Sequence, residues 1–239
     1  MNIIADLHSH SDLSHHAFSS LDEMMAAAAE IGLHALALTN HTSALEDGAQ
    51  AFHFASLWRL PREIRGVRFL GGAELNVMDD KGTVDLDEGI LKSLDFVVAS
   101  LHSVVCAPRD FDYHTASWLA IAQNPLIDCI GHSGQECFSY DIDRVVRACA
   151  DTGTVMEINS ASPHIRPDSR GNCCRIAKAC MKYGVQVAVN SDAHSRWEVG
   201  QFEEGLKLLD EVGFPEELVI NSSRERLAAY FEKRKGLVL

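Results

Sequence analysis

The sequence lacks any apolar run of the ~18–20 residues that a membrane-spanning helix needs. Its first residues also lack the basic start and long apolar core of a signal peptide, and Asp6 interrupts the apolar run early. These absences predict a cytoplasmic protein that has no membrane partner.

The chain has no C-x-x-C pair, and its seven cysteines are an odd number that stand mostly in apolar contexts. A free cysteine in such a context behaves as a small hydrophobic residue. The sequence therefore predicts neither a disulfide framework nor a thiolate zinc site.

Basic residues are few: 21 Lys and Arg stand against 34 Asp and Glu, a formal net charge of −13. This balance disfavours nucleic acid and anionic membranes as partners. An anionic substrate stays open, because bound cations would reverse the local sign of the charge. No long Pro/Gly/Ser linker and no short repeat divides the chain, so we expect one domain over residues 1–239.

Short β-type runs alternate with helical patterns along the chain. Strands are predicted at 3–6, 35–39, 68–74, 96–100, 127–130, 155–158 and 186–189. Helices are predicted at 21–31, 54–60, 88–94, 113–122, 142–151, 173–183, 202–212 and 223–233, and a small hairpin at 76–87. This alternation is typical of a parallel sheet covered by helices, and 239 residues is an ordinary length for an α/β barrel.

Metal-ligand residue types follow the ends of six of these strands. A lone His-x-His such as His8 and His10 is often a surface feature, but the register repeats along the chain. The ligand types are His8, His10, His41, Glu74, His102, His132, Asp192 and His194, with His15 or His16 in the first loop as a further candidate. The carboxyl ends of parallel barrel strands meet on one face, so the sequence predicts a polynuclear metal site there.

These residues carry a family resemblance. The segments Asp6–Ser11, Ser14–Ser19, Thr39–His41 and Ser191–His194, with Glu74, His102 and His132 between them, resemble the motifs of the PHP (polymerase and histidinol phosphatase) family, and most of all its YcdX-type probable phosphatases. The resemblance implies a distorted (β/α)7 TIM-like barrel with three zinc ions. It assigns His8, His10 and Asp192 to the first metal, His102 and His132 to the second with Glu74 bridging the two, and His16, His41 and His194 to the third. Two positions depart from the family pattern: Asn40 replaces an aspartate and Ser133 replaces a proline.

Nitrogen and carboxylate ligands suit zinc, with manganese or iron as alternatives. A hydroxide bridging the metals, held at Glu74, Asp192 and His132, would attack a small phosphomonoester. Loop residues expected to bind this substrate are Arg109, Asn159, Arg166 and Arg170. The alternatives are a histidinol-phosphate phosphatase, another phosphoesterase of the family, a nuclease or a non-catalytic metal-binding protein. The sequence leaves the substrate and the oligomeric state open, a homo-oligomer included.

Overall fold

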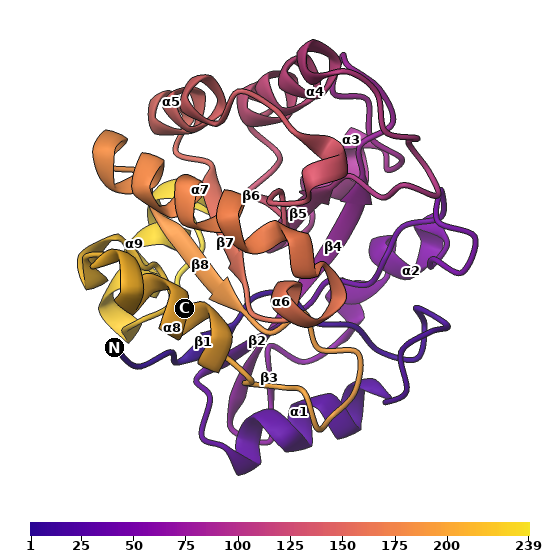
Figure 1. Ribbon diagram of the computed structural model, residues 1–239. Helices are drawn as coiled ribbons and strands as arrows, with labels where there is room; N and C mark the ends of the chain where they lie inside the picture. Colours follow the sequence, from indigo (N-terminus) through magenta and orange to yellow (C-terminus); the bar gives the residue numbers. More distant parts are fainter.

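Parallel strands form the centre of the computed structural model, which describes residues 1–239. Seven of them pair in the order β1 (Ala5–Asp6), β2 (Ala35–Leu38), β4 (Val67–Asn76), β5 (Phe96–Ser100), β6 (Cys129–Ile130), β7 (Val155–Asn159) and β8 (Val187–Asn190). The short strand β3 (Glu63–Ile64) pairs antiparallel with β4. Figure 1 shows the strands inside a surrounding layer of helices, an α/β barrel as predicted.

The barrel closes where β8 meets β1. At the carboxyl end, the backbone N–H of Asp192 donates to the carbonyl of His8 at 3.0 Å. Towards the other end, the side-chain amide of Asn221 lies between the two strands and donates to the carbonyls of Ala5 (2.8 Å) and Val189 (2.7 Å). The amide thereby pairs one backbone carbonyl on each of the two strands, a role that inter-strand backbone hydrogen bonds fill in a regular ladder.

Nine α-helices follow the strands: α1 (Leu21–Glu30), α2 (Ala51–Ala55), α3 (Glu88–Leu91), α4 (Phe111–Gln123), α5 (Ile142–Thr152), α6 (Ser162–Ile165), α7 (Arg170–Tyr183), α8 (Glu203–Val212) and α9 (Arg224–Lys235). Helix α1 begins at a capping box, in which Ser20 and Glu23 each bond the other's backbone N–H. Helix α7 ends at Gly184, which has a φ of 69° and forms a left-handed cap. None of the helices combines the length and the apolar character needed to cross a bilayer.

The apolar core has two layers. The larger layer lies between the strands and the surrounding helices. The smaller fills the barrel, where Phe96 and Val98 of β5 meet Leu227 and Phe231 of α9. Because the hydroxyl of Tyr230 in α9 donates to the carbonyl of Asp128, just before β6, this helix covers the amino end of the barrel. The carboxyl end is left free for chemistry.

Local differences from the predicted elements arise mainly in the second quarter of the chain. The predicted helix 54–60 is divided into α2 and a 3-10 turn, Leu57–Arg59. The predicted hairpin at 76–87 is reduced to a single bridge between Val77 and Val84. Strand β3 was not predicted, because its two residues pair only after Arg65 and Gly66 turn with positive φ angles of 55° and 80°. Helix α6 was also missed, since its four residues give too little periodicity.

Candidate metal centre

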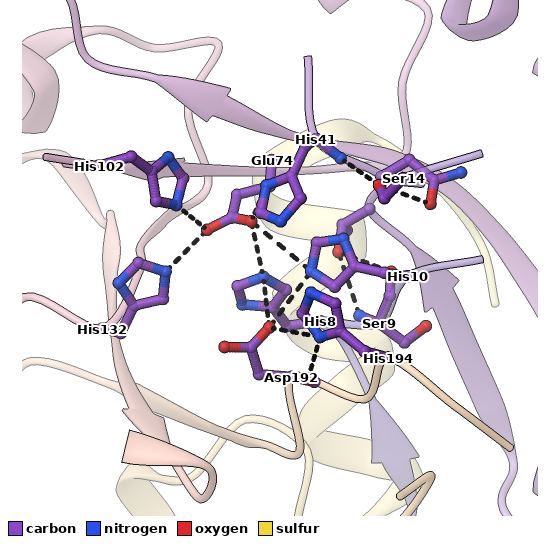
Figure 2. Close-up of polar contacts among 12 residues, drawn as sticks. His8, Ser9, His10, Ser14, His41, Glu74, His102, His132, Asp192 and His194 are labelled. Carbon is purple, nitrogen blue, oxygen red and sulfur yellow. Dashed lines mark hydrogen bonds and ion pairs between the residues drawn. The ribbon is translucent and has the colours of Figure 1, made fainter. Parts of the chain in front are cut away.

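The predicted ligand side chains meet at the carboxyl end of the barrel. Figure 2 shows the carboxylate of Glu74 among imidazoles from the ends of the neighbouring strands. His8 follows the end of β1 by two residues, and His132 follows the end of β6 by two residues. The residues brought together are His8, His10, His41, Glu74, His102, His132, Asp192 and His194, with His16 at the outer edge.

Glu74, on the longest strand, β4, lies at the middle of this cluster. Its Oε1 lies 2.8 Å from Nε2 of His132 and 3.4 Å from Nε2 of His102. Its Oε2 lies 2.8 Å from Nδ1 of His41 and 3.3 Å from Nε2 of His8. The side chain is fully buried. Nε2 of His10 lies 3.6 Å from the same Oε2. One carboxylate therefore faces five imidazoles, two on Oε1 and three on Oε2, which is the arrangement expected of a bridging ligand.

Asp192 occupies a constrained backbone position after β8. Its φ of 58° lies in the left-handed region, which non-glycine residues adopt infrequently and which is often found at functional sites. Its Oδ1 lies 3.2 Å from Nε2 of His10 and 3.5 Å from Nε2 of His8. Its Oδ2 accepts a hydrogen bond from Asn159 at 3.0 Å and lies 3.6 Å from Nη1 of Arg166.

A third group of imidazoles lies nearer to the solvent. Nε2 of His16 lies 2.9 Å from Nε2 of His194, and Nδ1 of His16 bonds the Asp47 carboxylate at 2.5 Å. The rings of His10 and His41 stack against each other with centroids 4.3 Å apart. Of the two histidines in the first loop, the structure therefore brings His16 to the cluster.

Several buried polar atoms of the cluster have no hydrogen-bond partner. They include Nε2 of His8, both ring nitrogens of His10 and Nε2 of His102; Nδ1 of His41 and Oε2 of Glu74 lie 2.8 Å apart but do not meet hydrogen-bond geometry. An unsatisfied buried polar atom costs about 1–3 kcal/mol, so such a concentration is the pattern expected of side chains that bind cations. Three sets have ligand atoms within 4.8 Å of one another: His8, His10 and Glu74; His41, Glu74 and His102; and His10, His41 and His194. The residues present therefore fit a group of bound cations.

The charges of Glu74 and His10 suit cations as well. Burial opposes ionisation of Glu74, but the neighbouring His41 and His8 outweigh it and hold its pKa well below the usual range. Burial, together with the positive charge of His41 and His194, lowers the pKa of His10 well below its usual value. An ionised carboxylate and a neutral imidazole are the forms that bind metal.

Glu157 is a functional candidate that the sequence reasoning missed. It is a buried carboxylate on β7, the strand that was expected to provide no ligand, and its Oε1 bonds Nδ1 of His8 at 2.7 Å. The available signal was a single acid in the middle of the otherwise apolar run Val155–Ile158.

The two departures from the family pattern have local roles. The Oδ1 of Asn40 accepts a hydrogen bond from the backbone N–H of Ser11 at 2.8 Å, and its amide nitrogen donates to the Ser11 hydroxyl. Asn40 therefore fixes the loop after β1 through Ser11 and does not hydrogen-bond the imidazole of a candidate ligand. Ser133 bonds the hydroxyl of Tyr140 at 3.0 Å, behind the site.

A cavity of about 1000 Å³ opens above the cluster. Of the four residues expected to bind substrate, only Arg166 lines it. Asn159 lies below the cavity, bonded to Asp192.

Arg170, in the first turn of α7, turns towards α8 and bonds Glu211 at 2.5 Å. Arg109 stacks on the ring of Tyr113, 5.0 Å from its centroid, at the start of α4. The structure therefore places both of these arginines outside the cavity, each held by a partner on the helical layer.

Comparisons with known proteins agree with this architecture. The family model of the PHP domain matches residues 6–161. The chain is 38% identical over 235 residues to a probable phosphatase of Acetivibrio thermocellus, covering 98% of both chains. It is 39% identical over 237 residues to a probable phosphatase of Thermoanaerobacter sp. (strain X514), covering 98% of this chain and 97% of the relative.

The fold is shared with a solved structure of much lower sequence identity. Histidinol phosphate phosphatase of Lactococcus lactis, crystallised with zinc, L-histidinol and phosphate, matches with a TM-score of 0.60 at 15% identity, over 90% of this chain and 95% of that one. The domain match, the identity over nearly the full length and the ligand-bearing strand ends together show that the chain belongs to the PHP family.

Proposed function

We propose that the protein is a metal-dependent phosphatase that hydrolyses a small phosphomonoester. The observation that carries the proposal is the set of unpartnered ligand atoms around Glu74, open to a cavity that Arg166 lines. The relatives named probable phosphatases, and the zinc and phosphate bound by the Lactococcus protein, support the same reading.

The ligand atoms suit three cations of the zinc type, with manganese or iron as alternatives. We assign His8, His10 and Asp192 to the first, His102 and His132 to the second with Glu74 shared between them, and His16, His41 and His194 to the third. The sets defined by distance overlap with this assignment but also place His10 beside His41 and His194. Bound cations would supply Lewis acidity and lower the pKa of water from 15.7 towards ~7.

The residues of the chain position the substrate and the attacking water. Arg166 has an unpartnered, buried Nη1 at the edge of the cluster, where it would donate to a phosphoryl oxygen. Glu74, Asp192 and His132 surround the place for the attacking water. Asn159 fixes the orientation of Asp192 through its 3.0 Å hydrogen bond, so that the other carboxylate oxygen stays turned to His10.

The cavity favours small substrates over nucleic acid. Glu203 and Glu204, which we call the acidic rim, also line the cavity that Arg166 lines, and the chain carries a net charge of −13. A polyanionic strand would be repelled by this rim, whereas a single phosphate can reach the cluster. The same acidic rim favours an amine on the substrate, which makes histidinol phosphate and other amino-alcohol phosphates a specific second candidate class.

The test is phosphate release from a panel of aryl, sugar, nucleotide and amino-alcohol phosphates by metal-loaded protein, with single-stranded DNA as a comparison. We expect release from at least one monoester that a chelator abolishes. Release from none of them would contradict the proposal, and degradation of DNA at a higher rate would favour the nuclease alternative.

A further inference from the structure

Below the metal centre, one carboxylate joins three of the segments that carry its ligands. Glu157 lies on β7 and its side chain is fully buried. It contacts residues on or next to β1, β6 and β8. We propose that Glu157 is a positioning residue that fixes the ring of His8 with Nε2 facing the metal and sets the end of β6 at His132. The inference depends on the metal centre of the proposed function but not on phosphate ester hydrolysis.

Glu157 accepts four hydrogen bonds. Its Oε1 accepts from Nδ1 of His8 at 2.7 Å and from the amide of Asn190 at 2.9 Å. Its Oε2 accepts from the backbone N–H of His132 at 2.7 Å and from the amide of Asn159 at 3.2 Å. An ionised carboxylate offers about four lone-pair positions, so all of them are filled. Glu157 therefore has no lone pair left for a metal, in contrast to Glu74.

The bond to His8 decides which ring nitrogen binds metal. A carboxylate only accepts, so Nδ1 of His8 carries a proton, and in the neutral ring the lone pair is then on Nε2. That Nε2 has no hydrogen-bond partner and lies 3.3 Å from Glu74 and 3.5 Å from Asp192, between the two carboxylates. A carboxylate behind a ligand histidine fixes the ring and makes it more basic, and losing such a partner weakens metal binding by about 10- to 100-fold.

The other bonds extend the same control to neighbouring ligands. Through the N–H of His132, Glu157 fixes the backbone at the point where β6 ends and a ligand of the second metal begins. Asn159 donates both to Glu157 and to Oδ2 of Asp192, which ties the first metal's carboxylate to the same centre.

The substitution Glu157→Gln tests this role, because a glutamine has one accepting oxygen and one donating amide. The backbone N–H of His132 cannot give up its proton, so the oxygen of the glutamine must face it. The amide then faces His8, whose Nδ1 has to accept and whose proton moves to Nε2. That proton occupies the lone pair that the metal needs.

The measurements are the number of zinc ions per chain and their affinities, from titration against a chromophoric chelator. We expect Glu157→Gln to bind one ion about 10- to 100-fold more weakly. Glu157→Asp, which keeps four acceptor positions, should recover part of that affinity. The matched control is Asp128→Asn, which changes another buried, multiply bonded carboxylate at the opposite end of the barrel and should leave zinc binding unchanged.

A measurement on the unchanged protein keeps the inference testable even if a variant fails to fold. In ¹⁵N spectra of zinc-loaded protein, His8 should carry its proton on Nδ1 and its metal on Nε2. Coordination through Nδ1, or wild-type zinc affinity in Glu157→Gln, would overturn the inference. Wild-type protein that binds no metal would instead contradict the proposed function itself.

Discussion

Replacing Arg166 with methionine tests how the substrate is held. The guanidinium lies 3.6 Å from Oδ2 of Asp192, and its Nη1 is buried without a hydrogen-bond partner. A phosphoryl oxygen would supply that partner. Hydrogen bonds to charged groups contribute about 1.5–3 kcal/mol, and about 1.4 kcal/mol corresponds to a tenfold change, so kcat/KM should fall about 10- to 150-fold.

The assay is steady-state hydrolysis of the best phosphomonoester, together with inhibition by inorganic phosphate. Arg166→Met should raise both the KM and the inhibition constant of phosphate, because both species lose the same contact. Arg170→Met is the matched control: that arginine follows the same strand but bonds Glu211, so its loss should change kcat/KM less than about twofold. Equal effects of the two substitutions, or an unchanged inhibition constant in Arg166→Met, would show that Arg166 does not bind the phosphoryl group.

Three further predictions concern metal binding and stability. Removing the metals with a chelator should lower the thermal midpoint of unfolding and adding zinc should restore it, because a ligand present at about 100 times its Kd stabilises by about 2.7 kcal/mol; an unchanged midpoint would speak against a bound metal. His16→Ala should remove one metal and leave the more buried ones, which elemental analysis would show, whereas loss of every metal would contradict a separate outer site. Asp128→Ala should lower the free energy of unfolding in urea by about 3–5 kcal/mol, because it leaves Lys235, 2.7 Å away, without its buried partner; a loss below about 1 kcal/mol would show that the pair does not hold α9 in place.

The fold could be predicted from the sequence because its pattern is local. The strand at 96–100 appears with the predicted bounds, and the helix starting after Ser20 begins at its capping box. The ligand cluster followed from the same pattern, since each candidate stands at a strand end and parallel strands end on one face. Spacing alone left His15 and His16 as alternative ligands, and the family resemblance selected His16.

The remaining features depend on contacts between distant segments. Three of the four partners of Glu157 (His8, His132 and Asn190) come from three other parts of the chain, so its role has no local signal. The closure of the barrel by Asn221 depends in the same way on β1 and β8 lying beside it. The side-chain direction of Arg170 was also beyond the sequence, because its partner Glu211 lies 41 residues further along the chain.

The most direct test of the account is phosphate release by one protein sample in three states: metal-loaded, stripped with a chelator and reloaded with zinc, with the metal content of each state measured in parallel. We expect about three metals per chain in the loaded state, release of phosphate from a small phosphomonoester, loss of that release on stripping and its return on reloading. Fewer than about two metals per chain would contradict the trinuclear assignment. Equal phosphate release by the stripped protein would contradict metal-dependent hydrolysis.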